Sequence, residues 1–366
     1  MKIGNKHYRT IWIKPDNPFE VLVIDQRQLP HELVIRELKN PDDFVHAIKE
    51  MVVRGAPLIG ITAAYGLYSA LLNSTAGNAE LNLQKAYNAI LATRPTASNL
   101  KWALQKQFYA IQEGKNLGEK IKLALDNANR MAEEDIKMCK QIGKHGLPLI
   151  ESLSKKKNEG EPVNILTHCN AGWLATVDYG TATSPIYLAH DAGIPVHVWV
   201  DETRPRNQGS SLTAYELGKH GIPHTIIVDN AGGHLMQRGM VDMCIVGTDR
   251  TTANGDVCNK IGTYLKALAA FDNKIPFYVA LPSSSIDWEI KDAAEIPIEE
   301  RSEHEVKHIQ GFDGRKIVSV QIAPSLSKAA NYGFDITPAR LVTGLITERG
   351  ICKPDRKELS LLFFDK

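Results

Sequence analysis

The feature that most constrains the fold is a regular alternation of short apolar runs and helical stretches after residue 162. The apolar runs have the length of buried strands, and they are Val163–Leu166, Val196–Val200, His224–Val228, Met243–Val246 and Phe277–Ala280. Helical stretches lie between them, near Pro185–Ala192, Ser211–His220, Gly232–Arg238 and Lys260–Phe271. This order is typical of a parallel sheet with right-handed crossovers, so we expect an α/β fold here.

The first part of the chain has a different pattern. Short strands are expected at Thr10–Ile13, Val21–Ile24 and Leu33–Leu38, and helices from Asp42 and at Leu58–Leu72, Leu83–Leu91, Leu100–Gln112 and Gly118–Ser152. The polar segment Ser154–Pro162 is the clearest break in composition along the chain. We therefore predict two domains, a mostly helical one over residues 1–155 and an α/β one over residues 156–366.

Composition and motifs exclude several classes of function. The chain has 43 Lys plus Arg and 42 Asp plus Glu, so no net field favours nucleic acid or a membrane surface as a partner. Its five cysteines are an odd number without CxxC spacing, which indicates a reducing, cytoplasmic setting and no zinc site. No strand is followed by G-x-G-x-x-G or G-x-x-x-x-G-K-[ST], which disfavours nicotinamide, flavin and nucleoside triphosphate binding.

Reactive side chains follow the predicted strands at their carboxyl ends, where ligands bind in open α/β sheets. Cys169 follows the first strand and is either a reactive group or simply a small buried residue. Gln208 lies at the start of a helix, where its amide could bind sugar hydroxyls. Asp249 follows an apolar strand, where burial would raise its pKa and suit it to acid catalysis. The alternative for Asp249 is an N-cap or an ion pair with Arg250.

Three segments are candidates for binding an anion. Arg54-Gly55-Ala56-Pro57 places bare backbone and a guanidinium at a helix N-terminus, although a tight turn with a solvated arginine explains it equally well. Arg94 precedes Pro95 in the same way, as if that proline started a helix, but an arginine alone is more often a surface residue. Asn259 and Lys260 are predicted to open the helix that ends at Phe271.

Together, the motifs RGAP, THCNAG, DETRPRNQG and VGTDRTTANGDVCNKIGTY resemble those of the S-methyl-5-thioribose-1-phosphate isomerase family of methionine salvage. The resemblance covers nearly the whole chain and includes Pro297–Ser302 and Phe334–Pro338. It implies an N-terminal helical domain with a small antiparallel sheet, a Rossmann-like C-terminal domain, a homodimer, and no metal or organic cofactor. It also implies a catalytic pair, Cys169 and Asp249, and contacts to a sugar phosphate from Arg54, Gly55, Ala56, Arg94, Gln208, Asn259 and Lys260.

The reaction implied by this resemblance converts an aldose 1-phosphate into a ketose. Asp249 would protonate the ring oxygen as the ring opens, and hydrogen would then move from C2 to C1. Cys169 either takes the C2 proton or only shields the transition state of a direct hydride shift, and the sequence leaves both routes open. Two related proteins remain as alternatives, a ribose-1,5-bisphosphate isomerase and a non-catalytic regulatory subunit of the translation initiation exchange factor.

Overall fold

A seven-stranded sheet forms the centre of the second half of the computed structural model, which describes residues 2–4, 6–94, 96–290 and 292–364. Its strand order is β18-β17-β12-β9-β6-β7-β8, and every neighbouring pair is parallel except β17 and β18. The strands are β6 (Val163–Thr167), β7 (Val196–Asp201), β8 (His224–Ile227), β9 (Met243–Val246), β12 (Phe277–Ala280), β17 (Gly344–Thr347) and β18 (Gly350–Cys352). The predicted α/β fold is confirmed, and each predicted strand of this region is present.

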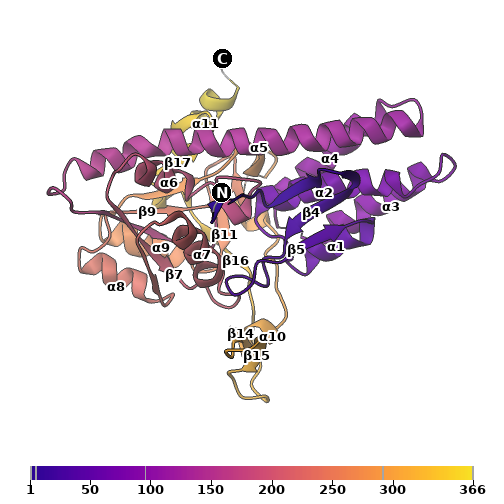
Figure 1. Ribbon diagram of the computed structural model, residues 1–366. Helices are drawn as coiled ribbons and strands as arrows, with labels where there is room; N and C mark the ends of the chain where they lie inside the picture. Colours follow the sequence, from indigo (N-terminus) through magenta and orange to yellow (C-terminus); the bar gives the residue numbers. More distant parts are fainter. Residues whose placement is uncertain (1, 5, 95, 291, 365–366) are drawn as a thin grey trace.

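Helices cover both faces of this sheet (Figure 1). The helices are α6 (Ser184–Asp191), α7 (Ala214–His220), α8 (Ala231–Gln237) and α9 (Thr263–Asp272), with a π-helical turn at Gly209–Thr213 before α7. Ile165 and Val198 pack with α6 on one face, and Leu166 and Val246 pack with α8 and α9 on the other. Because both faces are buried, the strands read as continuous apolar runs rather than alternating ones.

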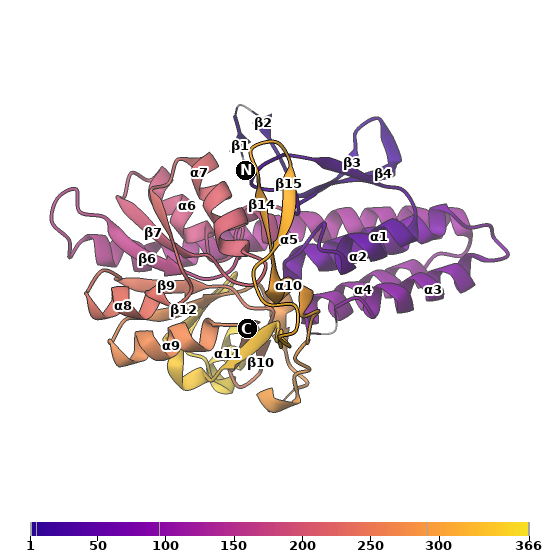
Figure 2. The same cartoon turned by 90° about the horizontal axis from the view of Figure 1, so that it is seen from below.

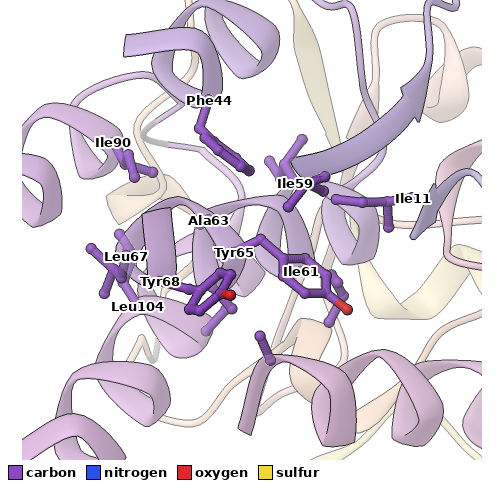
Figure 3. Close-up of a cluster of buried hydrophobic side chains, with 14 of the residues drawn as sticks. Ile11, Phe44, Ile59, Ile61, Ala63, Tyr65, Leu67, Tyr68, Ile90 and Leu104 are labelled. Atoms are coloured by element: carbon purple, nitrogen blue, oxygen red, sulfur yellow. The ribbon is translucent and has the colours of Figure 1, made fainter. Parts of the chain in front are cut away.

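The first half of the chain is mostly helical, as predicted. Three antiparallel strands form a small sheet, β3 (Ile11–Lys14), β4 (Asn17–Ile24) and β5 (Ile35–Leu38). The helices are α1 (Pro41–Lys49), α2 (Ala56–Leu72), α3 (Ala79–Leu91), α4 (Ser98–Gln112) and α5 (Leu117–Ser154). Apolar side chains surround α2 on all sides, so it forms the centre of this core (Figure 3).

Helix α5 belongs to both halves of the molecule. It has 38 residues, and Figure 1 shows it running along both the N-terminal helices and the large sheet. Ala124 and Ala128 lie in the N-terminal core, whereas Ile142 and Ile150 lie in the core of the sheet. The polar segment after Ser154 therefore connects α5 to β6, and the division of the chain at residue 155 stays a prediction.

The structure corrects the predicted start of two helices. A second sheet, which the sequence analysis did not predict, has the order β13-β10-β11-β16. Its strands are β10 (Arg250–Thr252), β11 (Val257–Lys260), β13 (Ile286–Asp287) and β16 (Phe334–Thr337). Asn259 and Lys260 thus lie on a strand, and α9 begins only at Thr263, because the antiparallel pairing of β11 with β16 extends through Lys260. Likewise α4 begins at Ser98, and Pro95 lies outside the described residues.

The remaining strands and α-helices come from the first seven residues and from the part of the chain after residue 303. They are β1 (Lys2–Ile3), β2 (Lys6–His7), α10 (His304–Lys307), β14 (His308–Phe312), β15 (Ile317–Gln321) and α11 (Arg356–Phe363). The hairpin β14–β15 projects from the body of the molecule in Figure 1, and Figure 2 views this projection from below. Gln310 on this hairpin donates a 3.0 Å hydrogen bond to the carbonyl of Arg27. Among the helices described, none is both long and apolar enough to cross a membrane.

Candidate active site

A small cavity of about 30 Å³ lies between the N-terminal helices and the carboxyl ends of the sheet strands. Six of the nine residues proposed from sequence line it, namely Arg54, Gly55, Ala56, Cys169, Asp249 and Asn259. The other lining residues include His168, Asn170, Thr176 and Pro282. The tertiary fold therefore brings together segments that are more than 200 residues apart in the chain.

Gly55 places the N-terminus of α2 at this cavity. Its φ is +94°, and a Cβ atom at this position would lie 2.5 Å from the Cα atom of Ala175. Only glycine combines that backbone conformation with so close an approach of two chain segments. Helix α2 starts at the next residue, so its unpaired N–H groups and the positive end of its dipole lie at the cavity. The predicted helix start is present at the cavity, and the binding of an anion there stays a prediction.

Arg54 is held at the cavity by one residue. Its Nη1 donates a 2.6 Å hydrogen bond to Asn170 Oδ1, and its Nη2 donates a 2.8 Å bond to the Asn170 carbonyl. These two bonds argue against the alternative of a freely solvated turn arginine. Both acceptors are neutral, so the guanidinium keeps its positive charge unneutralised by them.

Cys169 lies two residues after the end of β6 and has a left-handed backbone, with a φ of +63°. Its N–H donates to Thr203 Oγ1 at 2.9 Å, and its carbonyl accepts from Thr213 Oγ1 at 2.7 Å. These two bonds hold the unusual conformation and direct the chain into the cavity. Burial raises the pKa of the thiol, and the positive charges of Arg54 and Lys260 offset only part of that increase.

Asp249 follows β9 and lines the same cavity. Burial raises the pKa of its carboxyl, and the charges of Arg94, Lys260 and Arg54 act in the opposite direction. Arg250 instead pairs with Asp287 at 3.3 Å, and Asp249 precedes a strand, so both alternatives weighed for this aspartate are wrong. Within the described part of the chain, the Asp249 side chain forms no hydrogen bond or ion pair and is open to a ligand.

Lys260 and Arg94 provide positive charge near Asp249 without lining the cavity. Lys260 is 6% exposed at the end of β11, and burial lowers the pKa of its ammonium. Arg94 is only 7% exposed, so it is not a surface residue, and its Nε donates to Glu299 Oε2 at 3.0 Å. Glu299 also accepts a 2.6 Å bond from Arg301. The charge of Arg94 is therefore already paired with a carboxylate, in contrast to the charge of Arg54.

Gln208 lines a neighbouring cavity of about 410 Å³ that shares Arg54 with the smaller one. As predicted, it stands at the start of a helical segment, the turn Gly209–Thr213. Its Oε1 atom is buried without a hydrogen-bond partner among the described residues. Leu29, Met51 and Leu212 add apolar surface to this larger cavity. An unpaired buried amide oxygen is a group that a ligand hydroxyl can satisfy.

A buried polar cluster beneath Cys169 was missed by the sequence analysis. His168 Nδ1 lies 2.7 Å from Asp201 Oδ1, and Lys266 Nζ lies 2.6 Å from Asp201 Oδ2. Thr203, which accepts the Cys169 N–H, donates its own hydroxyl to Asp201 at 2.7 Å. The polar residues after each strand indicated that side chains of this kind would meet at the edge of the sheet. Which of them form pairs depends on the order of the strands, which the sequence did not show.

His168, Asp201 and Asp229 also bring possible metal-ligating atoms within 4.8 Å of one another. Their ligand atoms already have other partners, however. The Lys266 ammonium stands against Asp201, the Asp229 carboxylate accepts the N–H groups of Thr203 and Arg204, and His168 Nε2 lies 2.9 Å from the Ile261 carbonyl. Because the ammonium of Lys266 already pairs with Asp201 and the other ligand atoms accept or share hydrogen bonds, the trio does not fit a metal centre.

The fold and this cavity have counterparts in known proteins. A sequence model of the Initiation factor 2 subunit family matches residues 52–354, and the chain belongs to that family. It is 57% identical over 368 residues to the methylthioribose-1-phosphate isomerase of Desulfatibacillum aliphaticivorans, with all of both chains covered. Within the broader family, the chain is thus a member of the methylthioribose-1-phosphate isomerases.

Two solved structures agree with this placement. The crystal structure of 5-methylthioribose 1-phosphate isomerase from Pyrococcus horikoshii OT3 superposes with a TM-score of 0.83 at 40% identity, over 99% of this chain and 97% of that chain. The translation initiation factor eIF-2B subunit delta from A. fulgidus superposes with a TM-score of 0.78 at 38% identity, over 97% and 99%. Both catalytic and translation-related members of the family therefore share this fold.

Proposed function

We propose that this chain converts S-methyl-5-thio-α-D-ribose 1-phosphate into S-methyl-5-thio-D-ribulose 1-phosphate, as a cytoplasmic enzyme of methionine salvage. The observation that carries the proposal is that Cys169 and Asp249 line one cavity together with Arg54 and the N-terminus of α2. The names of its relatives, 55% to 58% identical over nearly the whole chain, support the same activity.

Arg54 and the backbone N–H groups at Gly55 and Ala56 are the proposed phosphate site. Lys260 and Arg94 add positive charge on the side of Asp249. Asn259 and Gln208 are the proposed partners of the sugar hydroxyls, and the part of the sugar beyond the reacting carbons extends into the larger cavity. These contacts contribute orientation, which lowers the entropic part of the barrier.

Asp249 is the proposed acid. The phosphate on C1 prevents ring opening through a free hemiacetal, so the ring oxygen must receive a proton as its bond to C1 breaks. The raised pKa of Asp249 keeps a larger fraction of that carboxyl protonated than an exposed aspartate would have. After donation, the carboxylate can accept the proton of the 2-hydroxyl as C2 becomes the ketone carbon.

Hydrogen moves from C2 to C1 in the second step. Because burial raises the pKa of Cys169, its thiol keeps its proton and is a weak base in the free enzyme. This favours direct transfer of the C2 hydrogen to C1 as hydride, with Cys169 shielding the reacting carbons from water. In the other route, a Cys169 thiolate removes the C2 proton and an enol-type intermediate is reprotonated at C1.

The test is turnover of the purified chain with 5-methylthioribose 1-phosphate and, in parallel, with ribose 1,5-bisphosphate. Ketose formation is the measured quantity. Preference for the methylthio sugar supports the proposal. Preference for the bisphosphate would assign the chain to the other sugar-phosphate isomerase, and turnover of neither would favour a regulatory subunit. A homodimer, expected from the family resemblance, is tested on the same sample by its sedimentation.

A further inference from the structure

Glu216 on α7 is a buried carboxyl outside the proposed catalytic set. Its side chain is fully buried, and burial raises its pKa to about 7. Burying a carboxylate costs several kcal/mol unless its oxygens accept hydrogen bonds. Each of its two oxygens has one N–H partner. Asn170 Nδ2 donates to Oε1 at 3.2 Å, and the backbone N–H of Leu174 donates to Oε2 at 3.1 Å.

The chain makes room for this carboxyl at Gly172, in the segment between Cys169 and Leu174. A Cβ atom on Gly172 would lie 1.4 Å from Glu216 Oε1, so any other residue at position 172 would force the carboxyl to move. The close approach explains the glycine of the motif THCNAG. It also shows that the loop after β6 is built around Glu216.

Asn170 connects Glu216 to Arg54. In its ionised form Glu216 only accepts hydrogen bonds, so it holds the NH₂ group of the Asn170 amide, and Oδ1 of that amide then faces the guanidinium. Thr213 Oγ1 accepts a second bond from the same NH₂ group at 3.2 Å. Glu216 thus fixes which end of the Asn170 amide faces Arg54. Among the described residues, the guanidinium itself has no direct acidic partner. Arg94, in contrast, contacts Glu299 directly.

We infer that Glu216 is a positioning residue, which orients Arg54 for phosphate binding through the Asn170 amide. This inference rests on the proposed role of Arg54 in holding the phosphate of the substrate. It predicts that loss of the carboxylate weakens binding of a phosphate group more than it slows the chemical step, because Glu216 reaches Arg54 and not the reacting carbons.

The test variant is Glu216→Gln, which keeps the size of the side chain. Its amide has only one acceptor oxygen for the two N–H groups, of Asn170 and Leu174, that donate to Glu216. Binding of inorganic phosphate is measured by calorimetry, and KM and kcat are measured with 5-methylthioribose 1-phosphate. We expect a roughly tenfold weaker phosphate affinity and a similar rise in KM, with kcat changed by less than about threefold. Unchanged phosphate affinity would overturn the inference.

Two controls separate positioning from general damage. Asp135 is also buried, with a pKa of about 7, and its Oδ2 accepts the Val177 N–H at 2.8 Å. The variant Asp135→Asn therefore removes a comparable carboxyl that has no bond to Asn170. A loss of phosphate affinity as large as that of Glu216→Gln would overturn the inference. In an Arg54→Ala background, Glu216→Gln should have no further effect, and a second tenfold loss there would also contradict it.

A third variant covers the case in which Glu216→Gln does not fold. Asn170→Ser removes the amide bridge but leaves the bond between Glu216 and Leu174, and it should weaken phosphate binding to a similar degree. Since calorimetry with inorganic phosphate needs no turnover, its result stands even if neither sugar is isomerised. A parent protein that binds phosphate but isomerises neither sugar contradicts the proposed function alone, and a parent that binds no phosphate contradicts the inference.

Discussion

Arg54 donates two hydrogen bonds to one residue, Asn170, which lies 116 positions later in the chain. The bonds join the end of the N-terminal α1–α2 connection to the loop after β6, the two segments that enclose the small cavity. The positive charge that would hold a phosphate and the thiol of Cys169 are therefore positioned by the same loop.

Replacement of either member of the proposed catalytic pair should abolish turnover without unfolding the protein. Cys169→Ser and Asp249→Asn preserve side-chain size, and loss of a positioned acid typically lowers kcat by about 10²–10⁴-fold. Steady-state kinetics measures the loss, and circular dichroism with urea unfolding controls for structure. A variant with a near-native rate would remove that residue from the mechanism.

The pH dependence of kcat should follow the protonation of Asp249. An acid acts in its protonated form, and burial raises the pKa of this carboxyl. The proton is therefore retained to higher pH than in an exposed aspartate, and kcat should fall as pH rises through the raised pKa. A profile of kcat against pH at saturating substrate tests this. A rate that instead rises over the same range would show that the ionised form is the active one.

The route of hydrogen transfer can be read from the isotope content of the product. Burial raises the pKa of the Cys169 thiol, which disfavours the thiolate and favours hydride transfer. A reaction run in D₂O should then give a ketose 1-phosphate with no deuterium bound to C1, as measured by mass spectrometry or NMR. Deuterium at C1 would establish exchange with solvent through an enol-type intermediate and make Cys169 the base.

Gly55→Ala should destabilise the protein and weaken phosphate binding together. The added Cβ would meet Ala175 at 2.5 Å, in a backbone with φ of +94°. Gly193 has a similar φ of +78° with no atom within 4 Å of the added Cβ, so Gly193→Ala measures the conformational cost alone. We expect about 1 kcal/mol for the control and about 2–3 kcal/mol more for Gly55→Ala, from urea unfolding. Equal losses would show that the loop adapts to the added atom.

The buried Asp135 should make stability depend on pH. Its pKa rises from 3.8 to about 7 on folding, so the native state binds the proton more tightly than the unfolded chain does. Wild-type stability should consequently fall between about pH 4 and pH 7, by up to about 4 kcal/mol from this group. Asp135→Asn does not titrate, so its stability relative to wild type should increase over that range. A constant difference across pH would mean that this carboxyl titrates alike in both states.

Local sequence patterns were sufficient to predict the elements whose apolar residues recur at the spacing of a strand or a helix. The apolar run Val163–Leu166 predicts β6, and the fully apolar pattern of α2 predicts a buried helix, because both depend on nearest neighbours in the chain. The strand β11 was missed because its register comes from β16, more than 70 residues later, and this long-range pairing prevails over the helical pattern that begins at Lys260.

Local patterns were enough to predict the alternating α/β half, the helical half, the polar residues after the strands and the start of α2, since spacing and turn chemistry act between near neighbours in the chain. Only the tertiary structure decided that Arg54 faces Asn170, that Arg94 is paired with Glu299, and that Glu216 lies behind the loop after β6. Such contacts join segments far apart in the chain, and burial changes the pKa of Cys169 and Asp249 only after those segments have packed. The chemistry of the site is therefore a property of packing rather than of any one motif.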